Sequence, residues 1–214
     1  EKELVLDLAL RLRRIIAERL GSEVVLTREE DTFVPLEART ALANERQADL
    51  FLSIHANASR SKSARGIETY YLNFTTDPEA LEVAARENAV SQETISQLQT
   101  LVQKIAMADK VDESREFATR VHKALGQGFS GGNRRGFDRG VKKAPFVVLI
   151  GANMPSVLTE VSFLSNPQDE KLLRTPEHRQ KIAEALFAGI QKYVETLSGV
   201  KVAHTEKAAA IAQQ

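Results

Sequence analysis

Two polar residues stand where apolar strands are expected to end, and their types could do chemistry. His55 follows the apolar run LFLSI at 50–54, and Glu160 lies within PSVLTEVSF at 155–163. In open α/β sheets, ligands bind outside the carboxyl ends of the strands. If the two strands run parallel, the imidazole and the carboxylate reach the same edge, where they suit a metal ligand and a general base.

Both residues also have a structural interpretation. A lone histidine at the end of a strand is often a surface or capping residue. A glutamate placed between Val157 and Val161 is costly to bury without a partner. Glu160 is therefore either a functional group or half of a buried ion pair, and the residues alone leave these alternatives open.

The elements that would position these groups alternate along the chain. Apolar residues recur at helical spacing in 1–20 and again from Ile182 to Leu197, and a helix is expected after Pro35 because proline suits a first helical turn. Strands are expected at 23–28, 49–55, 66–72, 144–150 and 155–163. This order predicts an α/β fold whose central sheet is mixed but mostly parallel, with helices on both faces.

The middle and the end of the chain differ from this pattern. Residues 77 to about 140 are expected to form a helical insertion that ends in a glycine-rich, basic stretch at 126–140. Residues 198–214 are polar and alanine-rich, which is typical of a flexible tail. We therefore expect one catalytic domain over 1–197, with the insertion inside it and the tail after it.

Composition excludes several classes of function. The 214 residues suit one domain, and a formal net charge of +0 gives no global attraction to nucleic acid or to an anionic membrane. No run approaches the roughly 18 apolar residues of a membrane-spanning helix. The chain has no cysteine, so thiol nucleophiles and disulfides are excluded, and any metal site must use His, Asp or Glu.

The chain contains four histidines, and three of them have ordinary interpretations. His122 is expected on an amphipathic helix in an exposed or packing role. His178 lies at the charged start of a helix, and His204 lies in the tail. His55 is therefore the candidate ligand among them.

Several segments together resemble a known family. SIHANAS at 53–59 precedes GIETYYL at 66–72, with LTR at 26–28 upstream and PSVLTEVSFLSNPQDEKLL at 155–173 downstream. The opening EKELVLDLAL, LEARTALAN at 36–44 and KAPFVVL at 143–149 agree as well. In this combination and order the chain resembles the zinc-dependent N-acetylmuramoyl-L-alanine amidases of the type-3 cell-wall family, over most of residues 1–197.

The resemblance implies a zinc site and a catalytic residue. It assigns Zn²⁺ binding to Glu1 and His55, with a further histidine expected upstream of residue 1, and it makes Glu160 the catalytic glutamate. A catalytic zinc takes three protein ligands and keeps one position open, and a His₂Glu set is known. Glu160 would then act as the general base and pass the proton on to the departing amine. Asn57, just after His55, either hydrogen-bonds substrate or caps the turn.

The layout also resembles a subset of the family that acts in Gram-negative cell division. In that subset a helical insertion is implied to cover the zinc cleft until an activator moves it. The resemblance therefore implies peptidoglycan as substrate, export to the periplasm, autoinhibition, and an activator protein of the LytM-domain type. We expect Glu87 to occupy the open position of the zinc; the alternative is that it belongs to a solvated face with Glu79, Glu82 and Glu93. The apolar stripe from Ile95 to Ile105 could dock the activator or pack on the core.

Two other functions remain open at this stage. The chain could be another zinc amidase or peptidase of similar fold. It could also be a catalytically incomplete domain that binds peptidoglycan or serves as a scaffold, since a chain lacking the first histidine should bind zinc poorly. Zinc content distinguishes the enzyme from the binding module.

Overall fold

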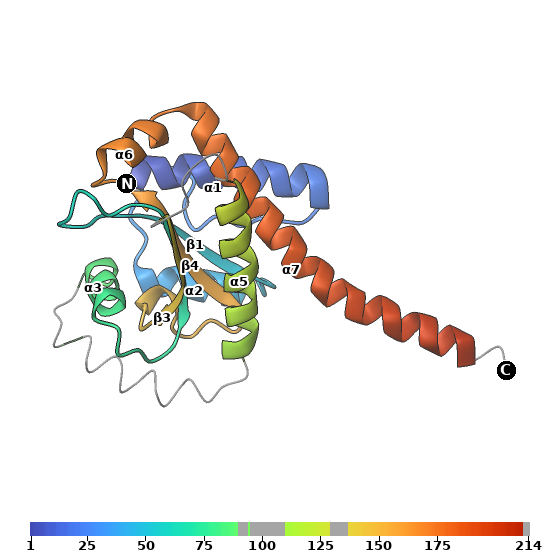
Figure 1. Cartoon of the computed structure of the whole chain (residues 1–214). Coiled ribbons are helices and arrows are strands. Elements are labelled where there is room, and N and C mark those ends of the chain that lie inside the picture. Colours follow the sequence, from blue (N-terminus) through green and yellow to red (C-terminus); the bar gives the residue numbers. More distant parts are fainter. Residues whose placement is uncertain (90–93, 95–109, 129–136, 212–214) are drawn as a thin grey trace.

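The computed structural model describes residues 1–89, 94, 110–128 and 137–211, and the central feature of these residues is one four-stranded sheet. The strands are β1 (Phe51–Asn57), β2 (Ile67–Leu72), β3 (Asp138–Ala144) and β4 (Ser156–Phe163), in the order β1-β4-β2-β3 (Figure 1). β1 pairs with β4 and β2 pairs with β3 in parallel, while β2 and β4 are antiparallel. The expected mixed, mostly parallel sheet is confirmed.

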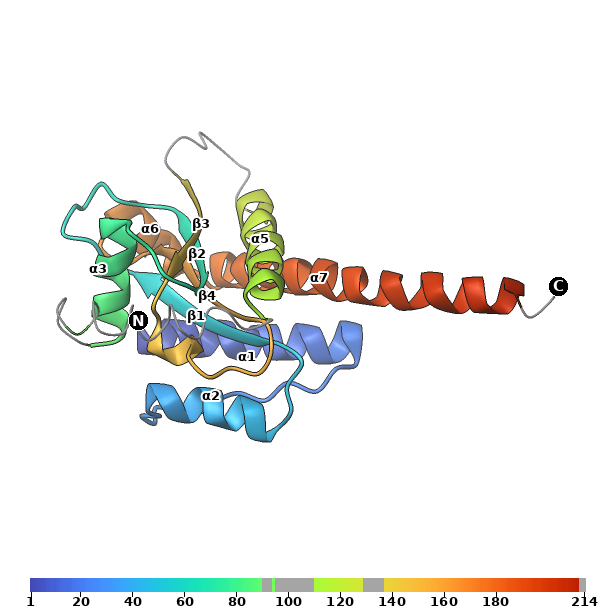
Figure 2. The ribbon, with the colours of Figure 1, turned by 90° about the horizontal axis from the view of Figure 1, so that it is seen from below.

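Helices cover both faces of the sheet, as expected. One face carries α1 (Lys2–Leu20), α5 (Val111–Gly128) and α7 (Pro176–Ile211). The other carries α2 (Leu36–Glu45), α3 (Pro78–Glu87) and the short 3₁₀ helix η1 (Val147–Leu149), and α6 (Pro167–Leu173) connects β4 to α7 (Figures 1 and 2). The strands of the middle are therefore covered on both sides, which explains why β4 is buried at every position.

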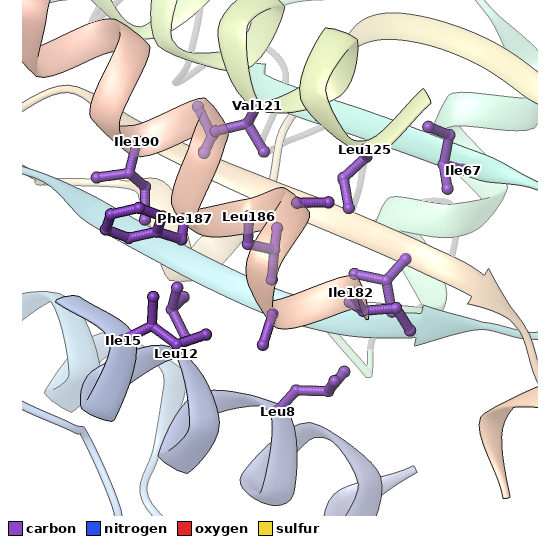
Figure 3. Packing of buried hydrophobic residues seen from close by; sticks show 14 of the residues in the cluster. Leu8, Leu12, Ile15, Ile67, Val121, Leu125, Ile182, Leu186, Phe187 and Ile190 are labelled. Atoms are coloured by element: carbon purple, nitrogen blue, oxygen red, sulfur yellow. The ribbon is translucent and has the colours of Figure 1, made fainter. Parts of the chain in front are cut away.

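The larger core lies between the sheet and the face with α1, α5 and α7. Figure 3 shows the apolar side chains that meet there: Leu8, Leu12 and Ile15 from α1, Ile182, Leu186, Phe187 and Ile190 from α7, and Val121 and Leu125 from α5. Each fully buried side chain of this kind contributes roughly 1.5–3 kcal/mol. At Gly189 an added Cβ would lie 2.6 Å from the Cα of Val121, so glycine allows α5 and α7 to cross closely.

The prediction of a strand at 23–28 is wrong. These residues form no strand. A cavity of about 730 Å³ is lined both by this segment, including Val24 and Leu26, and by Leu52 and Ile54 of β1. Val24 instead packs against the larger core. The apolar side chains of 23–28 therefore pack although the segment pairs with no strand. The alternation of residue types does not reveal whether a segment pairs with a neighbouring strand.

The strand expected at 144–150 is also wrong, because the strand lies earlier in the chain. β3 covers 138–144 and overlaps the stretch that we expect to be a glycine-rich connection. Pro145 has no backbone N–H to donate and follows the strand directly. The apolar residues beyond it turn into η1 and fill the second core: Phe146, Val148 and Leu149. β3 carries charged side chains, which suits a strand at the edge of a sheet.

The middle and the end of the chain partly agree with expectation. α3 and α5 are helices, as expected for this part of the chain, and α5 packs in the larger core. The apolar stripe from Ile95 to Ile105 lies outside the described residues. α7 continues to Ile211 through the expected tail, consistent with the high helix propensity of alanine. The domain boundaries stay a prediction. No described helix is long and apolar enough to span a membrane.

Candidate active site

The parallel pair β1–β4 brings His55 and Glu160 together. They are direct partners in the register of the two strands, at the carboxyl ends where ligands bind in such sheets. Glu1 reaches the same edge from the start of α1, where it is the N-cap residue. Its Oε1 lies 3.1 Å from Nδ1 of His55 and accepts a hydrogen bond from the backbone N–H of Ala56 at 3.2 Å.

α3 adds a third ligand atom to this pair. Oε2 of Glu87 lies 2.8 Å from Nδ1 of His55. One ligand atom each from Glu1, His55 and Glu87 lie within 4.8 Å of one another, and within the described residues this is the group that could hold a metal ion. Nε2 of His55 lies 3.1 Å from the hydroxyl of Ser53, a contact that fixes the orientation of the ring. One nitrogen and two carboxylate oxygens form a donor set that zinc accepts.

His55 and the nearby carboxylates shift one another's pKa values. Burial lowers the pKa of His55, but its contacts with Glu1 and Glu87 and the negative charge of Glu160 outweigh burial and raise the pKa to about 10. The imidazolium proton therefore sits where three carboxylates converge. A metal cation at the same place would replace that proton and balance the same negative charge.

Glu160 differs from every other carboxylate of the described residues. Its side chain is fully buried, and neither carboxylate oxygen has a hydrogen-bond partner. Burial raises its pKa well above the usual range; the charge of His55 lowers it, and the charges of Glu87, Glu1 and Glu68 raise it further. A buried carboxylate without a protein partner, beside residues that could hold a metal ion, is typical of a side chain that contacts a bound substrate or water. Its raised pKa suits a group that accepts and returns a proton.

A second buried glutamate, Glu68 on β2, was missed by the sequence reasoning. It is the register partner of Glu160 on the adjacent strand. Its carboxylate accepts hydrogen bonds from four side chains, namely Asn57, Tyr70, Arg139 and Lys142, at 2.6–3.0 Å. The same signal that selects Glu160, a glutamate inside an apolar strand, could have found it in GIETYYL.

Asn57, the candidate substrate-binding residue, is buried and already engaged. Its Nδ2 donates to Oε2 of Glu68 at 2.9 Å, and its Oδ1 accepts from the guanidinium of Arg86 at 2.6 Å. Asn57 therefore connects the sheet to α3, one residue before Glu87. Its role toward substrate stays a prediction.

The other histidines lie away from this cluster. His122 is buried rather than exposed, and it contacts Thr69 at 3.1 Å and Asp138 at 2.7 Å on the face covered by α5. His178 lies in the first turn of α7. The side chain of His204 is outside the described part of the chain.

Comparison with known proteins agrees with this geometry. The family model described as N-acetylmuramoyl-L-alanine amidase matches residues 1–192. The N-acetylmuramoyl-L-alanine amidase AmiC of Neisseria meningitidis serogroup B is 35% identical over 205 residues, which cover 92% of this chain and 48% of that protein. For the amidase AmiA of Salmonella typhimurium the identity is 33% over 216 residues, covering 97% and 72%. The chain thus spans about half the length of the AmiC relative.

Solved structures share the fold. The N-acetylmuramoyl-L-alanine amidase from Clostridium difficile 630 superposes with a TM-score of 0.68 at 28% identity, over 91% of this chain and 84% of that one. The catalytic domain of CwlV, an amidase from Bacillus (Paenibacillus) polymyxa var. colistinus, gives 0.65 at 30% identity, over 91% and 85%. The family model, which matches residues 1–192, includes the sheet edge that carries the candidate site.

Proposed function

The chain belongs to the N-acetylmuramoyl-L-alanine amidase family, and on that premise we propose that it hydrolyses the amide between N-acetylmuramic acid and L-alanine in peptidoglycan. The observation that carries the proposal is the pair of orphaned oxygens of Glu160 beside the donor set of Glu1, His55 and Glu87. A buried carboxylate without partners is rarely retained for stability.

We assign the metal to zinc, held by Glu1 and His55, with a further histidine expected upstream of residue 1. When bound, zinc supplies a Lewis acid that polarises the carbonyl of the scissile amide. The contacts of its two ring nitrogens with Ser53 and Glu1 hold His55 in one orientation, so the donor set is preorganised.

Glu160 performs the proton transfers. It takes a proton from the attacking water as the water oxygen bonds to the amide carbon, and it delivers that proton to the nitrogen of L-alanine as the C–N bond breaks. The products are the muramic acid carboxyl group and a free amine. The raised pKa of Glu160 matches this duty, because a carboxylate with a raised pKa is a stronger base toward the proton of water.

We further propose that the docked position of α3 is an inhibited state. Glu87 contacts His55 directly, so it occupies space that the substrate carbonyl needs. Cell-wall remodelling at daughter-cell separation, a periplasmic location and an activator of the LytM-domain type are proposed from the family resemblance, and the amidase names of the relatives support the cell-wall substrate.

Metal content and product release test the proposal together. The purified protein, including the segment expected to supply the further histidine, is loaded with zinc and its zinc is counted. Released stem peptide is measured from purified sacculi, with a chelated sample as control. We expect one zinc per chain and release that stops after chelation. Sacculus binding without zinc and without release would instead support the binding-module alternative. A different released fragment would support another zinc amidase or peptidase.

A further inference from the structure

A pair of positively charged side chains, Arg139 and Lys142, lies under the N-terminal end of α3, the end away from the candidate metal site. Arg139 and Lys142 of β3 share Oε1 of the buried Glu68, at 2.6 and 3.0 Å. They also share a second carboxylate, that of Glu79 in the first turn of α3, at 3.1 and 3.8 Å. One counter-charge therefore belongs to the sheet, and the other is supplied by α3.

The two carboxylates differ in how firmly they are held. The side chain of Glu68 is 2% exposed, whereas that of Glu79 is 70% exposed. If α3 leaves the sheet, the two cations face one carboxylate, and a partly buried site keeps a net positive charge. Such a site favours an anion, since an uncompensated buried charge is costly. Arg139 stays in place, because its guanidinium stacks over the ring of Phe163 at 5.3 Å.

There is room for a ligand at this point. A cavity of about 480 Å³ is lined by Asn57, Arg65, Glu68 and Arg139 from the body of the domain, and by Glu79 and Arg86 from α3. Ligand pockets of this size accept part of a peptide. Because Asn57 follows His55 by two residues, the cavity adjoins the candidate metal site.

The span from the metal donors to this cavity matches a short peptide. His55 lies on β1 and Arg139 on β3, which are three strand spacings or about 14 Å apart. α3 bridges the same interval, with Glu87 at His55 and Glu79 at Arg139, and eight residues of helix rise about 12 Å. Three to four residues of extended peptide cover that distance.

We propose that Arg139 and Lys142 form a subsite for a carboxylate of the peptide stem, about three residues beyond the cleaved amide, and that Glu79 fills this subsite while α3 is docked. The inference rests on the proposed function, since it takes the peptide stem as substrate. α3 then imitates the substrate at two points, with Glu87 at the metal donors and Glu79 at the carboxylate subsite.

Two probes that differ in one group test the subsite. N-acetylmuramoyl-tripeptides are prepared with a free C-terminal carboxylate or with a C-terminal amide, and their Kd is measured by titration calorimetry. The protein is the zinc-loaded full chain with Glu160→Gln, which prevents turnover, and with Glu79→Gln and Glu87→Ala, which remove the two side chains of α3 from the subsite and from the candidate metal donors. We expect the carboxylate probe to bind at least about tenfold more tightly than the amide probe.

Two matched lysine variants then test whether Lys142 causes the preference for the carboxylate probe. Adding Lys142→Gln should abolish the difference between the probes while Glu68 keeps its bonds to Arg139, Tyr70 and Asn57, so the fold is retained. Lys143→Gln removes the same charge from an exposed position of the same strand and should leave the difference intact. Restoring Glu79 should weaken binding of the carboxylate probe several-fold, because its carboxylate competes.

The outcomes separate the subsite from the amidase activity. Equal affinity for the two probes, no binding of either, or a preference that survives Lys142→Gln would overturn the subsite. Stem-peptide release by the chain with Glu160 intact is measured in parallel. Release without probe discrimination rejects the subsite alone, and discrimination without release rejects the amidase activity while supporting the subsite.

Discussion

Glu68 and Glu160 are buried glutamates on neighbouring strands, yet their surroundings are opposite. They face each other across the antiparallel pair β2–β4. Four side chains donate hydrogen bonds to Glu68, while neither oxygen of Glu160 has a partner. Burial alone therefore does not identify a functional carboxylate. The distinguishing property is the missing partner beside a group of residues that could hold a metal ion.

The electrostatics of the two groups differ in the same way. Burial raises the pKa of Glu68, but the hydrogen bond from Arg139 and the charge of Lys142 outweigh it and lower the pKa. Burial raises the pKa of Glu160; the charge of His55 offsets part of this rise, the charges of Glu87, Glu1 and Glu68 add to it, and the net shift is well upward. The protein stabilises the charged form of Glu68 and destabilises the charged form of Glu160, which suits a structural and a chemical role respectively.

The largest expected effect is on catalysis. Replacing Glu160 with Gln keeps the shape of the side chain and removes its basicity, so the rate of stem-peptide release should fall about 10²- to 10⁴-fold. The measurement is release from sacculi by zinc-loaded protein, with zinc content determined in parallel. Unchanged zinc content with lost activity supports the assigned role, whereas retained activity would contradict it.

The next effect is on stability, and it should have opposite signs at the two positions. Glu68→Leu leaves Arg139 and Lys142 without their buried partner and should lower the free energy of unfolding by about 2–3 kcal/mol. Glu160→Leu removes a buried carboxyl group without hydrogen-bond partners and should raise the free energy of unfolding by about 1 kcal/mol in the metal-free chain. Denaturant titration measures both changes. Two changes of the same sign would break the comparison.

A smaller effect is expected where α3 meets the site. Glu87→Ala removes the carboxylate that contacts His55, so basal release from sacculi without an activator should rise about tenfold, which corresponds to 1.4 kcal/mol. Glu82→Ala, an exposed carboxylate on the same helix, is the matched control and should leave the rate unchanged. No increase with Glu87→Ala would reject Glu87 as the inhibitory residue.

The smallest expected effect is on the stability of the fold at acidic pH. Since the folded-state pKa of Glu68 is lowered, its stabilisation is fully present above the unfolded value near 4.5 and is lost as pH falls through the folded pKa. As pH falls from about 5 through the folded-state pKa, the wild-type chain should therefore lose more stability than Glu68→Gln. Thermal unfolding across this range measures the difference. Parallel curves would show that Glu68 does not titrate there.

Most of the sheet was predictable because its strands repeat a local signal. β1, β2 and β4 are apolar runs bounded by polar or small residues, and α1 shows a regular helical stripe. β3 was missed because its sequence, DRGVKKA, is polar, and an edge strand needs only a hydrogen-bonding neighbour. The segment 23–28 failed for the converse reason, since apolar alternation does not reveal whether a partner strand lies alongside.

The candidate site was predictable in part. Strand ends located His55 and Glu160, because parallel strands bring their carboxyl ends to one edge. The contact between Glu87 and His55 depends on the packing of α3 over that edge, and no spacing in the sequence encodes it. The resemblance implies only a covering insertion, and Glu87 is expected at the metal because ARENA, at 85–89, opens that insertion on the cleft side. The polar network around Glu68 joins residues from three strands and a helix, which only the tertiary structure brings together.

The direction of α7 has a practical consequence for handling the protein. Figure 1 shows that this helix carries the C-terminal end away from the sheet, while the N-terminal end lies beside the candidate site. A surface tether attached to the distal part of α7 would therefore present the candidate active site outward. The same attachment near the start of α1 would crowd Glu1, a candidate metal donor, so immobilised sacculus assays should be anchored through α7.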